Sequence, residues 1–275
     1  MRKTLDRYVE ERLRRGRGYL LKTEAVGELA LSSAAFNAAA SRLARKGRVA
    51  PLRKGFVLIL RPEDYVFGAP PVSQWIDPLM RHLGIDYRIS LLSAAQFHGS
   101  AHQAPQEFQV IVPKQVRRIF MGRQRVRFMY QASHSFKAVN QSPWIGQLKT
   151  SAGYAKVAGI ELLLLDLVRY FRQAAGLNNV AQIVHDLGGQ ADPRKLARVA
   201  RACENATVRR LGYLLERFGH KRRAAALLPF ARKAKSLKPL HPRVRLVPSL
   251  ARGIKHPEAA AWKLILNVPV EIDDE

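Results

Sequence analysis

Four polar side chains recur at every fourth position between residues 33 and 45, a spacing that would place them in one row along a helix. They are Ser33, Asn37, Ser41 and Arg45. Hydroxyl, amide and guanidinium groups donate or accept hydrogen bonds at base edges in the major groove of DNA. Between them, Phe36, Ala40 and Leu43 follow the spacing of a buried helical stripe. We therefore expect a helix whose apolar face packs inward and whose polar face reads bases.

Cations flank this row. The residues expected to hold DNA phosphates are Arg42, Arg48, Arg53 and Lys54. Phosphate contacts fix the position of a protein on the duplex, whereas base contacts supply its sequence preference. We therefore expect the polar row to determine sequence preference and the cations to determine the position of the protein on the duplex.

The elements that must position these residues can be located from their capping and turn signals. Thr23 is expected to N-cap a short helix that continues through Leu29. Ser32 or Ser33 is expected to N-cap a second helix from about Ala34 to Lys46, which Gly47 terminates. Two β-like runs follow, at 48–52 and 56–60, around a turn of Arg53, Lys54 and Gly55. This order is typical of a winged helix-turn-helix. The alternative is a small helical bundle with a hairpin whose charges only face solvent.

A first helix over residues 4–15 is expected to pack behind the recognition helix, with Arg7, Arg12, Arg14 and Arg15 outside. The segment 61–74 is interrupted by proline and glycine and predicts a linker. We expect a DNA-binding domain at 1–66 and a larger C-terminal domain at 72–275.

The C-terminal part mixes both kinds of secondary structure, so the expected fold class is α+β. Strands are predicted at 108–112, 126–130, 146–157 and 262–270, and a short extended entry followed by a helix over 87–99. Helices are predicted at 72–83, with a break near Pro78, and at 160–171, 178–187, 193–204, 207–218 and 221–233, the last interrupted by Pro229.

The balance of charge is the most unusual property of the sequence. Its 47 Lys and Arg residues exceed its 21 Asp and Glu residues by 26. The excess falls in three blocks, at 1–61, 101–160 and 192–256, and nucleic acid is the expected partner of so basic a chain. The sequence contains neither a long apolar segment nor a secretory signal, and Cys203 is the single cysteine. We expect a cytoplasmic protein in a reducing compartment.

Several stretches together resemble the AbiEi family of antitoxins from bacterial abortive-infection toxin-antitoxin systems. They are LARKGRVAPLRKGFVLI at 43–59, YRISLLSAAQFHG at 87–99 and GIELLLLDLVRY at 159–170. The resemblance covers most of residues 5–170. It implies an N-terminal domain that binds repeats in the promoter of its own operon, and a C-terminal domain that counters a nucleotidyltransferase-like toxin. Where the family wing usually has Arg-Gly-Val-Tyr, this chain has Lys54, Gly55, Phe56 and Val57, so the aromatic residue is displaced.

No constellation of residues predicts an enzyme or a cofactor. The sequence lacks GxSxG, HExxH, a GxxxxGK[ST] loop and the Gly-Ser and Asp-x-Asp of a nucleotidyltransferase. His98 and His102 are four residues apart, but Gly99 intervenes and no set of three or four ligands accompanies them, so we expect no metal site. Asp166, after a run of leucines, is expected to be a capped or paired acid in a buried helix.

The segment 209–238 is basic and amphipathic. A second basic surface could be formed by Arg209, Arg210, Lys221, Arg222 and Arg223. Three interpretations stay open: a second contact to DNA phosphates, a platform for an acidic toxin surface or RNA, or a solvated surface.

Three functions are consistent with the sequence. The first is a DNA-binding autorepressor that is also the antitoxin of a toxin-antitoxin pair. The second is a winged-helix regulator without a toxin, whose C-terminal domain serves oligomerisation or ligand sensing. The third is a nucleic-acid-modifying enzyme with a basic substrate channel.

Overall fold

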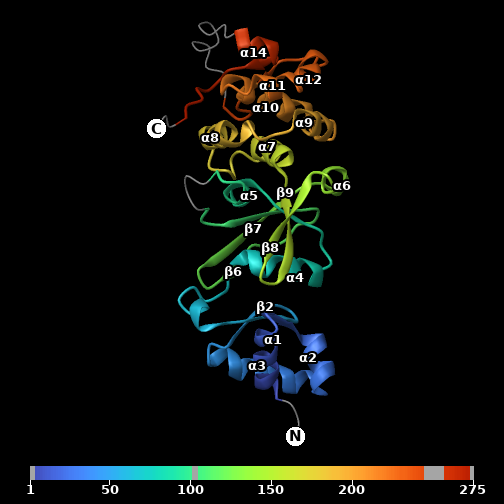
Figure 1. Cartoon of the computed structure of the whole chain (residues 1–275), viewed down its shortest axis with the longest axis vertical. Helices are drawn as coiled ribbons and strands as arrows, with labels where there is room; N and C mark the ends of the chain where they lie inside the picture. Colours follow the sequence, from blue (N-terminus) through green and yellow to red (C-terminus); the bar gives the residue numbers. More distant parts are fainter. Residues whose placement is uncertain (1–3, 101–104, 245–256, 273–275) are drawn as a thin grey trace. The chain divides into compact units, whose positions relative to one another are not determined.

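The computed structural model describes residues 4–100, 105–244 and 257–272 (Figure 1). The chain forms two compact units. One contains the described residues up to Tyr87 together with Gln106–Tyr130 and Gln147–Lys156, and the other contains Arg88–Pro105, Gln131–Gly146 and the described residues from Val157 onward. The units do not follow the expected boundary between 66 and 72. One local reason is that the amide of Arg123 donates to the carbonyl of Phe67 at 2.7 Å, which fastens the segment after the wing to a later hairpin.

The N-terminal segment is a winged helix-turn-helix. Its elements are α1 (Leu5–Arg14), β1 (Tyr19–Leu21), α2 (Lys22–Leu29), α3 (Ser33–Arg45), β2 (Val49–Arg53) and β3 (Phe56–Ile59). The strands form an antiparallel sheet in the order β1-β3-β2. The hairpin β2–β3 is the predicted wing, and Gly55 adopts a φ of 80° at its turn. Strand β1 was not predicted, because three residues are too short to show a periodicity.

The winged helix-turn-helix has a hydrophobic core made from its own residues. Side chains from all three helices and from the wing take part, and every buried member of the cluster falls between Leu5 and Ile59. The expectation that Arg12 faces outward was wrong. Its side chain is 5% exposed and forms an ion pair with Glu24, whose carboxylate supplies the compensation that a buried charge needs.

The helix-turn-helix begins two residues earlier than predicted. Helix α2 starts at Lys22 with Leu21 in the N-cap position, so the expected cap by Thr23 was wrong. The amide of Lys22 donates to the carbonyl of Gly55, which continues the pairing of β1 with β3 into the start of the helix. For α3 the prediction was confirmed: Ser32 is the N-cap, and its hydroxyl accepts from the amide of Ala35 at 3.1 Å.

The predicted linker contains short ordered turns rather than an open chain. Two 3-10 helices, η1 (Pro62–Asp64) and η2 (Val72–Gln74), occupy it. Helix α4 (Ile76–His82) follows and includes Pro78 in its first turn, where the missing amide hydrogen is tolerated.

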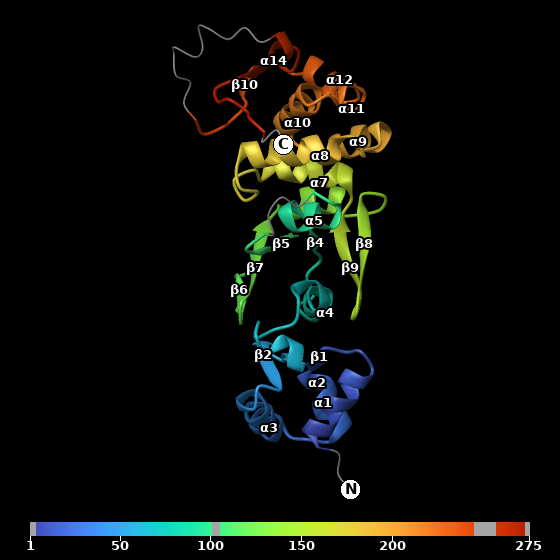
Figure 2. The same cartoon turned by 60° about the vertical axis from the view of Figure 1, so that its left-hand side comes forward.

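A six-stranded mixed sheet carries the strands of the middle of the chain. Its order is β6-β7-β5-β4-β9-β8 (Figure 2). The strands are β4 (Arg88–Ile89), β5 (Phe108–Val112), β6 (Ile119–Met121), β7 (Gln124–Tyr130), β8 (Ile145–Thr150) and β9 (Gly153–Ala158). Strand β7 pairs parallel to β5 and antiparallel to β6. The stretch 146–157, predicted as one strand, contains two strands, β8 and β9. Ser151 and Ala152 form the turn between them.

The C-terminal part is mainly helical. Its helices are α5 (Leu91–Phe97), α6 (Ser133–Val139), α7 (Ile160–Arg169), α8 (Leu177–Gly188), α9 (Pro193–Ala200), α10 (Asn205–Arg217), α11 (Lys221–Ala225), α12 (Leu228–Arg232) and α14 (Pro257–Ala261). Two short strands, β10 (Lys238–Pro239) and β11 (Leu264–Ile265), pair in parallel. The strand expected over 262–270 was thus wrong in extent. Trp262 lies fully buried, and Asn267 uses its side-chain amide to bind the carbonyls of His241 and Val244.

Candidate nucleic-acid interface

Helix α3 separates an apolar from a polar face as its sequence predicts. Phe36, Ala40 and Leu43 are 3%, 7% and 6% exposed and belong to the hydrophobic core of the winged helix-turn-helix. Ser33, Asn37, Ser41 and Arg45 are all exposed. The structure therefore brings the four expected base readers to one accessible face.

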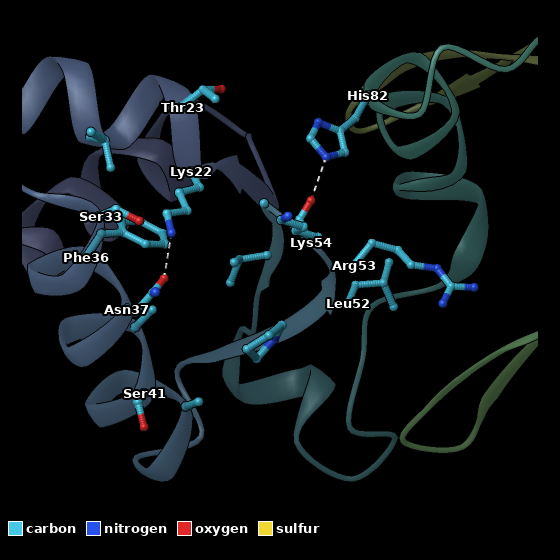
Figure 3. A pocket seen from close by; sticks show the side chains of 16 residues that line it. Lys22, Thr23, Ser33, Phe36, Asn37, Ser41, Leu52, Arg53, Lys54 and His82 are labelled. Atoms are coloured by element: carbon cyan, nitrogen blue, oxygen red, sulfur yellow. Dashed lines mark hydrogen bonds between the residues drawn. The ribbon is translucent and has the colours of Figure 1, made fainter.

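A groove of about 1040 Å³ lies between α3 and the wing (Figure 3). Ser33, Asn37 and Ser41 line it from α3, and residues 51–55 line it from the wing. Arg45, one turn beyond Ser41, is not among the lining residues. The groove therefore contains three of the four expected base readers, whereas Arg45 lies outside it at the end of the helix.

Lys22 is a residue of this groove that sequence reasoning missed. Its Nζ donates to Oδ1 of Asn37 at 2.9 Å and lies 5.7 Å from the ring centre of Phe36 (Figure 3). The contact engages Oδ1 of Asn37, a side chain that lines the groove. The signal in the sequence that could have identified Lys22 is its position at the start of the first helix of the helix-turn-helix.

The two cations at the turn of the wing differ: the side chain of Lys54 is exposed, whereas the side chain of Arg53 forms hydrogen bonds. Lys54 is exposed, and its main-chain carbonyl lies 3.0 Å from Nε2 of His82 (Figure 3). Arg53 instead donates from Nη2 to the main-chain carbonyls of Arg117 at 2.9 Å and Arg118 at 3.5 Å.

The two remaining phosphate candidates also differ. Arg42 is exposed on α3. Arg48 forms ion pairs with Asp6 at 2.8 Å and Glu10 at 3.4 Å, both on α1. Any phosphate that binds Arg48 must compete with these two carboxylates.

The expected second basic surface is only partly accessible. Arg209 and Arg210 are buried, at 2% and 9% exposed, and burial lowers the pKa of each guanidinium. They donate to the main-chain carbonyls of Ser236, Lys263 and Pro239. The inclusion of Arg209 and Arg210 in a surface was therefore wrong, because α10 is central to the C-terminal helices and its arginines bind the carbonyls of the chain around it.

The other three members of that set lie on α11. Arg223 is half-buried and donates to the carbonyls of Gly189 and Ala191. Lys221 and Arg222 are exposed. Two of the five residues thus remain available to a partner.

His98 and Cys203, the histidine and the single cysteine that the sequence draws attention to, have structural surroundings in the fold. His98 binds the carbonyl of Ala158 through Nε2 at 2.8 Å, and His102 lies outside the described residues. Within the described ranges, no three His, Cys, Asp or Glu side chains gather as metal ligands. Burial raises the pKa of the Cys203 thiol to about 12, so this group is not an activated nucleophile at neutral pH.

Comparison with known families finds a match in the part of the chain that follows the groove-forming segment. Residues 88–217 match the model of the AbiEi antitoxin C-terminal domain. Residues 88–217 belong to the AbiEi antitoxin family. The AbiEi domain supports a role as the antitoxin of a toxin-antitoxin system.

A solved structure shares the fold of almost the whole chain. The crystal structure of the RV2827C protein from Mycobacterium tuberculosis aligns with a TM-score of 0.65 at 17% sequence identity, over 96% of this chain and 92% of that one. At this identity the likeness shows the fold alone. No curated protein matches the sequence. Among the described residues, no helix preceding, within or following the AbiEi domain is long and apolar enough to cross a membrane.

Proposed function

We propose that this protein is a DNA-binding transcriptional autorepressor and the antitoxin of a bacterial abortive-infection system, and that it counters a nucleotidyltransferase-like toxin. In this proposal residues 1–66 bind inverted repeats in the promoter of the protein's own operon, and residues 72–275 neutralise the toxin. The role of antitoxin follows from the AbiEi domain. The finer parts, DNA recognition and the class of toxin, are inferences.

The observation that carries the DNA-binding part is the groove between α3 and the wing. An exposed polar row on one helix lies beside a hairpin with a free lysine at its turn. A helix of this kind enters the major groove of DNA while the wing reaches the adjacent backbone. We expect Asn37, Ser41 and Arg45 to contact bases, with Ser33 at the start of the row, and Arg42 and Lys54 to contact phosphates.

The test is binding of the full chain to duplex DNA from upstream of its own gene, against a scrambled duplex of equal length and composition, over a range of salt concentrations. We expect tighter binding to the upstream DNA and a steep fall of affinity with salt. Equal affinity for both duplexes would contradict autorepression. It would leave the antitoxin role to be tested by co-expression with a nucleotidyltransferase-like toxin encoded beside this gene, as the proposal requires, and we expect this co-expression to restore growth.

A winged-helix regulator without a toxin partner gives the opposite pattern. It would bind the upstream DNA with preference but would not protect cells from the adjacent gene product. The two experiments together therefore separate the autorepressor part of the proposal from its antitoxin part.

A further inference from the structure

A second concentration of cations lies on the hairpin β6–β7 and the loop before it, in the same compact unit as the wing. The segment 106–130 contains Lys114, Arg117, Arg118, Arg123, Arg125 and Arg127. The first five are exposed and Arg127 is half-buried. Glu107 is the one acidic residue of the segment, and its oxygens lie 3.6 Å from Arg118 and from Arg127. The helix-turn-helix does not account for this charge.

Arg53 connects this loop to the wing. Its Nη2 donates to the main-chain carbonyls of Arg117 and Arg118, whose own side chains are exposed cations. On the other side of the turn, His82 binds the main-chain carbonyl of Lys54. The backbones that carry Lys54, Arg117 and Arg118 are therefore held next to each other by side chains that leave these three cations exposed.

We propose that the wing and the loop 113–118 form one surface for the phosphates of duplex DNA. In it Lys54, Arg117 and Arg118 contact phosphates, and Arg53 acts as a positioning residue that fastens the loop to the wing. The inference rests on the proposed function and extends its DNA contact beyond the helix-turn-helix. It also changes the role expected for Arg53, whose guanidinium binds main-chain carbonyls.

The repeat of charge in DNA favours this partner. Each strand presents one phosphate per roughly 3.4 Å of helix axis, so cations that continue from a wing meet further phosphates of the same backbone. Such contacts add affinity without adding sequence preference. An acidic protein surface would also attract the loop, but the loop is joined to the hairpin that already lies beside the recognition helix.

The experiment measures binding of the full chain to its upstream duplex and to the scrambled duplex, by fluorescence anisotropy from about 50 to 200 mM salt. The test variant is Arg117→Gln with Arg118→Gln. We expect roughly tenfold weaker binding to both duplexes, and a salt slope that is shallower by about 1.8 because two phosphate contacts are lost. The matched control is Arg194→Gln with Arg198→Gln, which removes the same charge from exposed positions of α9. We expect the control to keep the wild-type slope.

Arg53→Met tests the positioning role. If Arg53 only fastens the loop, Arg53→Met weakens binding in the wild-type background but adds no further loss to the Arg117→Gln, Arg118→Gln variant. A direct phosphate contact would instead lower the slope by a further amount of about 0.9 in that background, and this result would overturn the positioning role. Thermal unfolding of each variant checks that the fold is retained.

The outcomes separate the two proposals. Wild-type preference for the upstream duplex, with an unchanged slope in Arg117→Gln, Arg118→Gln, overturns the extended surface and leaves the proposed function standing. A wild-type chain that shows no preference contradicts autorepression itself. In that case a shallower slope of the loop variant on both duplexes still supports the surface as a site for duplex DNA.

Discussion

Arg88 and Asp166 form a bidentate ion pair inside the AbiEi domain, with Nε 2.9 Å from Oδ2 and Nη2 2.9 Å from Oδ1. Arg88 is fully buried and Asp166 is 3% exposed. The hydroxyl of Ser90 donates to Asp166 at 2.8 Å, and the oxygen of Gln131 accepts from Arg88 at 2.6 Å. The pair joins β4 to α7, and its charges are compensated by further hydrogen bonds, as a buried pair requires.

Removal of one partner of this pair is expected to destabilise the protein strongly. Asp166→Ala leaves the guanidinium of Arg88 buried without its carboxylate, and we expect the free energy of unfolding to fall by about 3–5 kcal/mol. Denaturant unfolding measures the change. The control is Asp86→Ala, which breaks the exposed ion pair with Lys156 and is expected to cost less than about 1 kcal/mol. Equal losses in both variants would contradict a special role for the buried pair.

The two serines at the start of α3 are expected to have different functions. Ser32→Ala removes the N-cap hydrogen bond to the amide of Ala35 and should lower the stability by about 1 kcal/mol, without a direct effect on a DNA contact. Ser33→Ala leaves the cap intact and alters a lining residue of the groove. Thermal unfolding and DNA binding of both variants test this assignment. A larger loss of stability from Ser33→Ala would show that the cap is placed wrongly.

Substitution of Arg45 and substitution of Lys54 are expected to impair different aspects of DNA binding. Arg45→Ala should reduce the preference for the upstream duplex, since a good base contact contributes about 1–3 kcal/mol of discrimination. Lys54→Ala should weaken binding to every duplex alike and make the salt slope shallower by about 0.9. Competition binding with upstream and scrambled DNA measures both. If the two variants lose affinity equally on all sequences, the division between base and phosphate contacts is wrong.

Lys22 is expected to orient Asn37 for recognition. Lys22→Met removes the donor that occupies Oδ1 of Asn37, so the amide can rotate and present either its oxygen or its nitrogen to a base. We expect the preference for the upstream duplex to fall by roughly tenfold, as for loss of one base contact. The matched variant Asn37→Ala should have a similar effect, and the double variant should lose no more than either alone. Additive losses would contradict the coupling.

Local signals in the sequence were sufficient for the recognition helix. Serine at the N-cap, the apolar stripe at Phe36, Ala40 and Leu43, and the glycine that follows the helix all act within a few residues of α3. The resemblance of residues 87–99 and 159–170 to the AbiEi family was likewise carried by short stretches, and the family match over 88–217 confirms it.

Contacts between distant residues could not be predicted in this way. Arg12, Arg209 and Arg210 were expected outside because arginine is rarely buried alone. Each lies buried since the fold supplies an acceptor far along the chain: Glu24 for Arg12, and main-chain carbonyls for the other two. Strand β1 and the division of 146–157 into two strands escaped prediction for a related reason, because such short strands are stabilised by pairing rather than by their own sequence.

The sequence by itself determined the three helices and the hairpin of the winged helix-turn-helix, its polar row and its excess of positive charge, because each depends on residue type and spacing. Only the tertiary structure decided which cations stay exposed. Arg48 is held by two carboxylates of α1 and Arg53 by two carbonyls, while Lys54, Arg117 and Arg118 stay exposed. The physical reason is that a guanidinium binds the acceptors that folding brings within hydrogen-bond reach, here 2.8 to 3.5 Å, and those acceptors lie 38 to 65 residues away along the chain.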